Sequence, residues 1–264
     1  MEGPCNLVII RHGLSEHNLA KNRGIYLDKR HTSNYKLTDI GKSHAKICGE
    51  FIKDNISEYF DKYFTSEYVR AVETAYYLDL PDSEWETNFY LRERDKGTEA
   101  GKRSNVKKEF YWSPPGGESM ATLCIRVDQF LNFLNENCSG LNVVIVTHGT
   151  LMEAFRIRLE NMDKKRYEEL VRDEKIKNCE ILWYTQRNPI TKKYTGEKWM
   201  TKICPYDIDI SEINWNKIQK FTYKNNELRI RFDNINNLID TNDEEKKILC
   251  KDNHGCMYIG MDFN

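Results

Sequence analysis

An arginine, a histidine and a glycine directly follow a short apolar run near the start of the chain, in the stretch Leu7-Val-Ile-Ile-Arg11-His12-Gly13. Such a run of β-forming residues predicts a buried strand, and glycine lets the backbone turn sharply beside a ligand. A histidine at a strand end can be a nucleophile, a base or a ligand, or it can be purely structural. Because the guanidinium of Arg11 fits phosphate bidentately, the stretch favours an anionic substrate.

A second apolar run, Asn142–Thr147, also ends in a histidine and a glycine, His148 and Gly149. In parallel α/β sheets, ligands bind outside the carboxyl ends of the strands. If the two strands are parallel neighbours, both histidines emerge at the same edge of the sheet, with Arg11 beside them. Two imidazoles and a guanidinium that face one pocket predict a phosphate site with a nucleophile in it.

Composition narrows the classes of partner. The chain has 264 residues and a formal net charge of −1, so no global positive field points to nucleic acid. No apolar run is long enough to span a bilayer, and we expect neither nucleic acid nor a membrane as a partner; the oligomeric state is left open. The first residues lack the basic region of a signal peptide, and the eight cysteines lack a framework spacing. We therefore expect reduced, buried thiols and a cytoplasmic protein.

Alternating strands and helices are expected to carry these residues. Residues 15–36 predict a short helix and then a long polar loop, either a solvated surface or a lid that faces substrate. Further strands are expected at 61–66, 85–91 and 178–185, and helices at 39–54, 119–136, 150–159 and 163–172. The predicted fold class is α/β: a three-layer sandwich with a mostly parallel central sheet flanked by helices.

Polar residues mark the expected helix starts. Thr38 is an N-cap candidate, as are Ser119 and its neighbour Glu118, and Ser66 is expected to cap the helix that follows the strand at 61–66. Arg70 then lies in the first turns of that helix, at the same sheet edge as the first histidine. A helix N-terminus there favours anions, although a surface arginine is the alternative.

The composition changes after residue 185, where the chain becomes rich in Lys, Asn and aromatic residues. We expect two parts, a catalytic domain at 1–185 and a β-rich C-terminal extension at 186–264 whose role is unknown. Its short alternating runs predict strands at 198–203, 218–223, 228–232 and 247–250. Cys250, His254 and Cys256 could hold zinc, but their spacing is not standard and a structural interpretation is favoured.

Taken together, these motifs resemble the histidine phosphatase superfamily, also called the phosphoglycerate-mutase-like family, over residues 7–185. The segments that carry the resemblance are Arg11-His12-Gly13 with Ser15 and Asn18, Leu37-Thr38-Asp-Ile-Gly41-Lys-Ser-His-Ala45, Thr65-Ser66-Glu-Tyr-Val-Arg70-Ala71-Val-Glu-Thr74-Ala75, Leu91-Arg-Glu93, and Val146-Thr-His148-Gly149. Pro115-Gly-Gly-Glu118-Ser119 is similar to small phosphatase members of the cytosolic type. Leu14 departs from the family pattern, because mutases and many phosphatases carry Glu or Gln there. The stretch from Glu93 to His148 is also shorter than in the classical mutases.

The resemblance implies phosphoryl transfer through a phosphohistidine, with the following site residues. His12 would be the nucleophile, while Arg11, Arg70 and His148 would neutralise the phosphoryl oxygens. Glu93 would protonate the leaving group and then activate water. The expected substrate-binding residues are Gly13, Ser15, Asn18 and Gly149.

This chemistry needs no metal and no cofactor, because arginines and histidines supply the positive charge. The expected activity is that of a phosphatase acting on a small phosphorylated substrate. A phosphoglycerate-type mutase is the alternative enzyme, and a non-catalytic scaffold on the same fold is the alternative outside catalysis. Glu118 is the rival of Glu93 for the role of general acid, although capping of a helix would explain Glu118 equally well.

Overall fold

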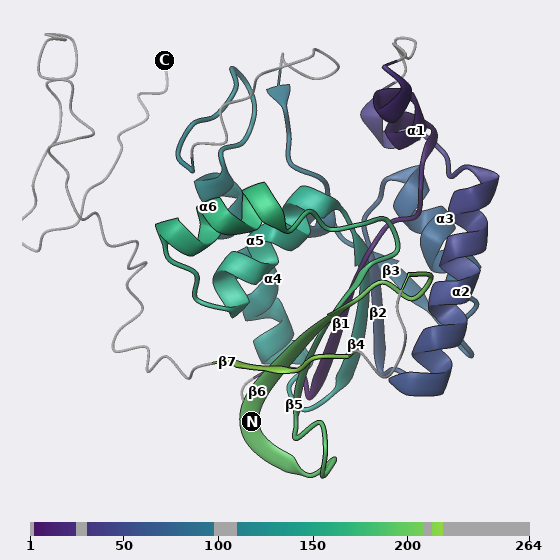
Figure 1. The fold of residues 1–264 in the computed structure, drawn as a ribbon, viewed down its shortest axis with the longest axis vertical. Coiled ribbons are helices and arrows are strands. Elements are labelled where there is room, and N and C mark those ends of the chain that lie inside the picture. Colours follow the sequence, from purple (N-terminus) through teal and green to yellow (C-terminus); the bar gives the residue numbers. More distant parts are fainter. Residues whose placement is uncertain (1–2, 25–30, 98–109, 208–212, 219–264) are drawn as a thin grey trace, which may run out of the picture. The chain divides into compact units, whose positions relative to one another are not determined.

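The computed structural model describes residues 3–24, 31–97, 110–207 and 213–218, all of which belong to the unit Met1–Thr222. Seven strands form one sheet in the order β3-β2-β4-β1-β5-β6-β7 (Figure 1). Their bounds are β1 Asn6–Arg11, β2 Lys62–Thr65, β3 Trp85–Thr87, β4 Asn142–Thr147, β5 Ile181–Arg187, β6 Tyr194–Ile203 and β7 Asn216–Ile218. The first four strands in the sheet order are parallel, and β5, β6 and β7 add antiparallel pairings.

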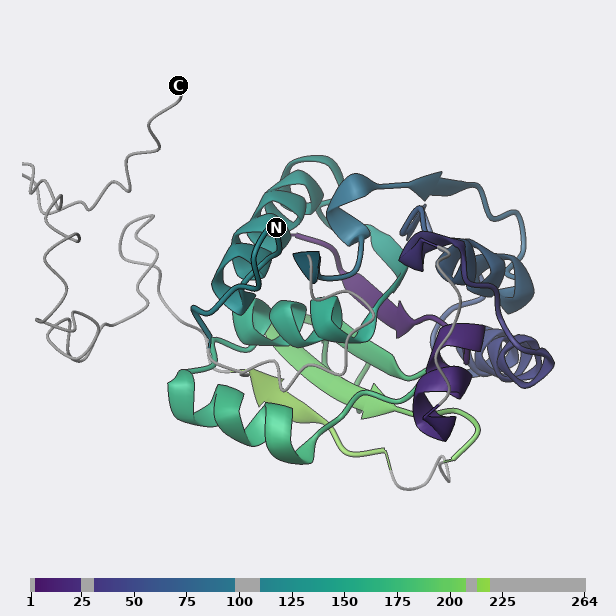
Figure 2. The same cartoon turned by 90° about the horizontal axis from the view of Figure 1, so that it is seen from above.

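Helices cover both faces of this sheet. One side carries α2 (Asp39–Asn55) and α3 (Val69–Leu78), and the other carries α4 (Met120–Asn137), α5 (Gly149–Leu159) and α6 (Lys164–Asp173), as Figures 1 and 2 show. The short helix α1 (Glu16–Arg23) follows the carboxyl end of β1. The expected three-layer α/β sandwich with a mostly parallel centre is therefore confirmed.

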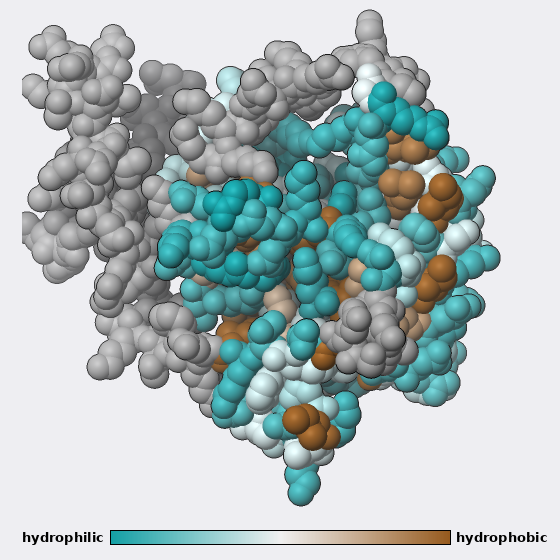
Figure 3. Space-filling model, in the orientation of Figure 1, coloured by the Kyte–Doolittle hydropathy of each residue, from teal (hydrophilic) through white to brown (hydrophobic). Residues whose placement is uncertain are grey.

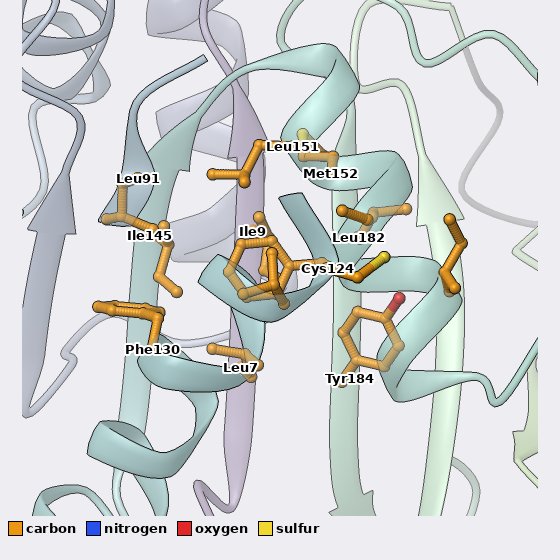
Figure 4. Close-up of a cluster of buried hydrophobic side chains, with 14 of the residues drawn as sticks. Leu7, Ile9, Leu91, Cys124, Phe130, Ile145, Leu151, Met152, Leu182 and Tyr184 are labelled. Carbon is orange, nitrogen blue, oxygen red and sulfur yellow. The ribbon is translucent and has the colours of Figure 1, made fainter. Parts of the chain in front are cut away.

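Alternate side chains of the central strands build two separate cores, because successive residues of a strand point to opposite faces. Leu7 and Ile9 of β1 join a cluster with α4 and α5, part of which Figure 4 shows. Val8 and Ile10 of the same strand join a second cluster with α2 and α3. All four side chains are almost completely excluded from solvent. A strand that is buried on both faces reads as a continuous apolar run, which is why the run was visible in the sequence.

Two expected N-caps are confirmed and a third is wrong. Thr38 Oγ1 accepts a hydrogen bond from the N–H of Gly41, and Ser119 Oγ accepts one from Thr122. Ser66, in contrast, does not cap α3. Its N–H continues the sheet ladder by donating to the carbonyl of Val146 (3.0 Å), and its Oγ accepts the N–H of Tyr68 (3.4 Å), which still precedes the helix. The helix begins only after Tyr68, which makes no side-chain cap bond.

The strand expected at 85–91 is shorter than its pattern indicated. Asn88 Oδ1 accepts a hydrogen bond from the N–H of Tyr90 (2.9 Å), so β3 ends at Thr87 and a 3₁₀ turn covers Phe89–Leu91. A second 3₁₀ turn, Thr32–Asn34, lies between α1 and α2.

The C-terminal strands that the structure describes extend the central sheet. β6 pairs with β5 along its length, and β7 pairs with the outer edge of β6. The division of the chain at residue 185 stays a prediction. The strands expected at 228–232 and 247–250 and the zinc candidates Cys250, His254 and Cys256 lie outside the described residues.

The surface is mostly hydrophilic. Hydrophilic side chains cover most of the face that Figure 3 shows, with scattered hydrophobic spots among them. Ile40 of α2 and Val72 of α3 are among the exposed hydrophobic side chains. None of the helices that the structure describes is long and apolar enough to cross a bilayer. Among the described residues, Cys5, Cys48, Cys124, Cys138, Cys179 and Cys204 are free and buried thiols, as expected.

Candidate active site

The register of two neighbouring parallel strands brings the two histidines together. β1 pairs with β4 so that Arg11 faces Thr147, and the N–H of His12 donates to the Thr147 carbonyl (2.8 Å). The next residue of each strand is therefore a histidine at the same sheet edge. The ring centroids of His12 and His148 lie 5.1 Å apart, with planes at 62°, and both side chains are buried. The juxtaposition that the two strand ends predicted is present.

Arg70 of α3 lies between the two imidazoles. Its Nε donates to Nε2 of His12 (3.1 Å), and its NH2 group donates to Nδ1 of His148 (3.1 Å). Its NH1 group donates to the carbonyl of Thr32 (2.6 Å). With only 6% of its surface exposed, Arg70 is a buried site residue, and the alternative of a surface arginine is wrong.

Hydrogen-bond partners assign the tautomers of both rings, because arginine can only donate. Nε2 of His12 accepts from Arg70, so its proton resides on Nδ1 and is donated to the carbonyl of Gly13 (2.8 Å). Nδ1 of His148 likewise accepts, so its Nε2–H donates to the hydroxyl oxygen of Ser66 (2.7 Å). The free electron pair of His12 is thus on the nitrogen that faces the guanidinium.

Both imidazoles are neutral at physiological pH. Burial lowers the pKa of His12 well below its usual range, and the charges of Arg70 and Arg11 lower it further. Burial is also the main cause that lowers the pKa of His148, followed by the charge of Arg70. A neutral imidazole beside two guanidinium groups is nucleophilic, and its surroundings favour an anion.

Arg11 supplies a second guanidinium that the protein leaves partly unpaired. Its NH1 group donates to the carbonyl of Ile176 (2.5 Å), whereas its buried Nε has no hydrogen-bond partner among the described residues. Gly149 lies against this side chain, since a Cβ at that position would be 3.2 Å from Nε of Arg11. The absence of a side chain at Gly149 therefore lets the Arg11 side chain lie close to the start of α5.

Several contacts hold the turn after His12. The N–H of Gly13 donates to Oγ1 of Thr74 (2.9 Å), and a Cβ on Gly13 would be only 2.7 Å from the carbonyl oxygen of Gly41. Nδ2 of Asn178 donates to the carbonyl of His12 (2.9 Å) and to that of Gly13 (3.1 Å). Sequence reasoning missed Asn178, because no local pattern brings residue 178 to this turn.

Ser15 and Asn18 form the capping box that starts α1. The hydroxyl of Ser15 donates to Oδ1 of Asn18 (2.9 Å), and Nδ2 of Asn178 donates to the same oxygen (3.2 Å). Ser15 is fully buried and Asn18 is half-buried. Of these two predicted binding residues, Ser15 supports the turn, while Asn18 provides the carboxamide oxygen that Ser15 and Asn178 share.

Ser66 and Tyr68 also belong to this cluster, although sequence reasoning gave them other roles or none. Ser66 holds His148, as described above, and the ring of Tyr68 packs against His148 with centroids 4.9 Å apart. The guanidinium of Arg70 lies 4.9 Å from the centroid of the same Tyr68 ring. Their place in the motif that contains Arg70 was the signal that could have identified them.

Glu93 is half-buried beside the arginines. One of its carboxylate oxygens accepts the N–H of Arg94 (2.9 Å). Burial lowers the pKa of both Arg11 and Arg70, and the Glu93 carboxylate is the largest charge that opposes this effect. Glu93 therefore lies within electrostatic reach of both guanidinium groups.

Further positive charges surround the approach to this edge. Burial and then the charge of Lys96 lower the pKa of His17, and the same two causes lower the pKa of Lys21. Such mutual repulsion between cations is relieved when an anion binds. Among the described residues there is no group of three His, Cys, Asp or Glu side chains that could hold a metal ion.

The fold and this edge define the class: an α/β protein with paired histidines and arginines at the carboxyl ends of its parallel strands. The model of the histidine phosphatase superfamily (branch 1) matches residues 7–192. The chain belongs to the histidine phosphatase superfamily.

Mutases are among its relatives in sequence, and phosphatases are among the solved structures that share its fold. A 2,3-bisphosphoglycerate-dependent phosphoglycerate mutase of Methylocella silvestris is 30% identical over 178 residues, which cover 60% of this chain and 83% of that protein. A phosphoserine phosphatase of Entamoeba histolytica, solved with 3-phosphoglyceric acid, has a TM-score of 0.54 and 24% identity, over 69% of this chain and 90% of that chain. A mycobacterial glucosyl-3-phosphoglycerate phosphatase, solved with VO3, has a TM-score of 0.57 and 19% identity, over 80% of this chain and 96% of that chain. The two structures show a shared fold.

Proposed function

We propose that this protein is a phosphatase that hydrolyses small phosphomonoesters without a metal ion or cofactor, through a phosphohistidine on His12. The observation that carries the proposal is the contact between Nε2 of His12 and Nε of Arg70 (3.1 Å). It places the free electron pair of a neutral, buried imidazole beside a guanidinium, where a phosphoryl group would be both attracted and attacked. The unpaired buried Nε–H of Arg11 supports the proposal, because an anion would supply the acceptor that the described residues lack.

In the first step, Nε2 of His12 forms a bond to phosphorus while the ester P–O bond breaks. Arg11, Arg70 and His148 would stabilise the charge on the equatorial oxygens, which is the main catalytic contribution in phosphoryl transfer. The imidazole ring becomes more positive as the P–N bond forms, and the carbonyl of Gly13 on Nδ1–H (2.8 Å) stabilises that charge. Glu93 donates its proton to the leaving oxygen.

In the second step, water attacks phosphorus, the P–N bond breaks, and Glu93 takes the proton of the water. Inorganic phosphate leaves, and both residues return to their starting state. Asn18 and the backbone N–H of Gly149 would contact the phosphate directly. Ser15 and Gly13 would contribute by holding the turn, because their polar groups already have partners in Asn18 and Thr74.

The test is turnover on a panel of phosphomonoesters, with His12→Ala as the variant. We expect wild-type turnover to survive a chelator and to be inhibited by vanadate. Acid-labile, base-stable phosphate should be trapped on the wild type only. Unchanged turnover in folded His12→Ala would refute the nucleophile, and chelator-sensitive activity that a divalent ion restores would refute the metal-free mechanism.

A phosphoglycerate mutase is the second candidate, supported by the mutase that is 30% identical over 178 residues. It would use the same phosphohistidine but return the phosphoryl group to a second hydroxyl. Incubation with 3-phosphoglycerate and 2,3-bisphosphoglycerate separates the two: 2-phosphoglycerate as product would identify a mutase, and glycerate with inorganic phosphate would identify a phosphatase.

We propose a cytosolic location for the protein, since the six free cysteines among the described residues fit a reducing compartment.

A further inference from the structure

The carboxylate proposed as the general acid lies on a segment with little regular structure. After the 3₁₀ turn Phe89–Leu91, the chain through Glu93 forms no helix and no strand up to Lys96. Proton transfer to a leaving group requires the carboxyl group within hydrogen-bond reach of it. Some other feature of the molecule must therefore fix the position of this segment.

Arg126 of α4 supplies that anchor. Its NH1 group donates to the carbonyl oxygens of Tyr90 (2.7 Å) and Arg92 (2.8 Å), and its NH2 group donates to the carbonyl of Glu93 itself (3.3 Å). Only 10% of the Arg126 side chain is exposed. A single guanidinium thus binds three carbonyls, one within the 3₁₀ turn and two in the segment that follows it.

Glu118 holds Arg126 and the far end of the same segment. Its two carboxylate oxygens accept from Nε and NH2 of Arg126, both at 2.9 Å, which is the bidentate geometry that arginine favours. One of those oxygens also accepts the N–H of Asp95 (2.8 Å), and the backbone carbonyl of Glu118 accepts from Nε of Arg94 (2.7 Å). Because these bonds engage both carboxylate oxygens, Glu118 has a structural role. The sequence analysis had considered it as the alternative general acid.

We propose that Arg126 and Glu118 are positioning residues that hold the Glu93 carboxyl group against the leaving oxygen. The inference rests on the proposed function, because it assigns them a role in the step that Glu93 performs there. Neither residue touches substrate; both act through the backbone of the segment. Displacement of a catalytic group by about 1 Å can cost about 10²-fold in rate, and the loss should fall only on the step that needs the proton.

Arg126→Lys is the informative variant. Lysine keeps the positive charge, which contributes to the lowered pKa of His148, but it lacks the planar fork that reaches three carbonyls and two carboxylate oxygens. We expect single-turnover phosphorylation by an alkyl phosphate to slow by about 10²-fold, with KM unchanged. Phosphorylation by a nitrophenyl ester should be almost unaffected, because its leaving group needs no proton.

Arg158→Gln is the matched control. Nε of Arg158 on α5 pairs at 2.7 Å with Asp128 of α4, the helix that carries Arg126, and 20% of the Arg158 side chain is exposed. This variant loses an ion pair between α5 and α4 and should show no dependence on the leaving group. Glu118→Gln is the second variant, for the case that Arg126→Lys does not fold; it should show the same dependence on the leaving group in weaker form.

The double variant Glu93→Gln/Arg126→Lys completes the test. If Arg126 acts through Glu93, the second substitution should add nothing to the slow alkyl-ester reaction of Glu93→Gln. Additive losses, or equal losses on both esters, would overturn the positioning role while leaving the proposed function intact. A Glu93→Gln enzyme without any dependence on the leaving group would instead refute Glu93 as the acid, and the inference with it.

Discussion

Acid should destabilise this protein through the two buried histidines. Burial lowers the pKa of His12 and His148 well below 6.5 in the folded state, whereas the unfolded chain binds protons near pH 6.5. The unfolded state therefore gains protons first as pH falls. The contribution of the two neutral histidines to stability is complete above about pH 6.5. It is lost as the pH decreases from there toward their lower pKa values in the folded state.

The size of the effect follows from the burial of both rings, with 2% of His12 and none of His148 exposed. While the folded state stays unprotonated, each histidine costs about 1.4 kcal/mol per pH unit below its unfolded pKa. Between about pH 7 and about pH 5.5 this amounts to roughly 1.2 kcal/mol for each residue, or roughly 2.5 kcal/mol for the pair. Most carboxylates contribute little in this range, because their ordinary pKa values lie below it. Burial raises the pKa of Glu180, so its protonation in the folded state would oppose part of the loss.

Urea unfolding followed by circular dichroism at the two pH values, in buffers without phosphate, measures this loss. His12→Gln and His148→Gln should each remove a substantial part of the pH dependence, and His17 and His44, whose pKa values burial also lowers, account for a further part. Both variants should be less stable at about pH 7. His31→Gln, which removes an exposed histidine, is the control and should keep the full dependence. If the wild type loses no stability between the two pH values, or if the two variants keep its slope, the buried histidines are not neutral and the argument fails.

Three further predictions concern single contacts. Ser66→Ala leaves the Nε2–H of the buried His148 without its acceptor, so the free energy of unfolding should fall by about 1–3 kcal/mol, and kcat should fall as well. A variant that equals the wild type in both denaturation and kinetics would refute the tautomer assignment. Gly149→Ala places a Cβ 3.2 Å from Nε of Arg11, so steady-state kinetics should show weaker substrate binding while the melting temperature stays the same or rises, since alanine favours a helix; a normal KM would show that the guanidinium can shift freely. A chain that ends after residue 218 keeps β7 on the sheet, so its melting temperature should be close to that of the full chain. A chain that ends after residue 190 exposes the edge of β5 and should aggregate. Equal solubility of the two truncated chains would contradict a supporting role for β6.

The sequence alone was sufficient to predict those features of the structure that depend on a single strand or a single turn of helix. The apolar runs before His12 and His148 specified two doubly buried strands, because burial on both faces leaves a continuous apolar signature. Thr38 predicted the start of its helix correctly, because an N-cap bond spans only three residues. The two histidines and Arg70 could be grouped because the carboxyl ends of parallel strands, and the helices that follow them, meet at one edge.

Tertiary structure alone decided which partners those residues have. Ser66 has the chemistry of an N-cap, yet α3 begins only after Tyr68, and the Ser66 hydroxyl binds a histidine 82 positions away. Asn178 meets the turn at His12 across 166 positions, and Arg126 reaches three carbonyls of a segment more than thirty positions earlier. Local patterns encode the periodicity of one element, whereas these side-chain bonds depend on how distant elements pack, so only the folded chain determines them.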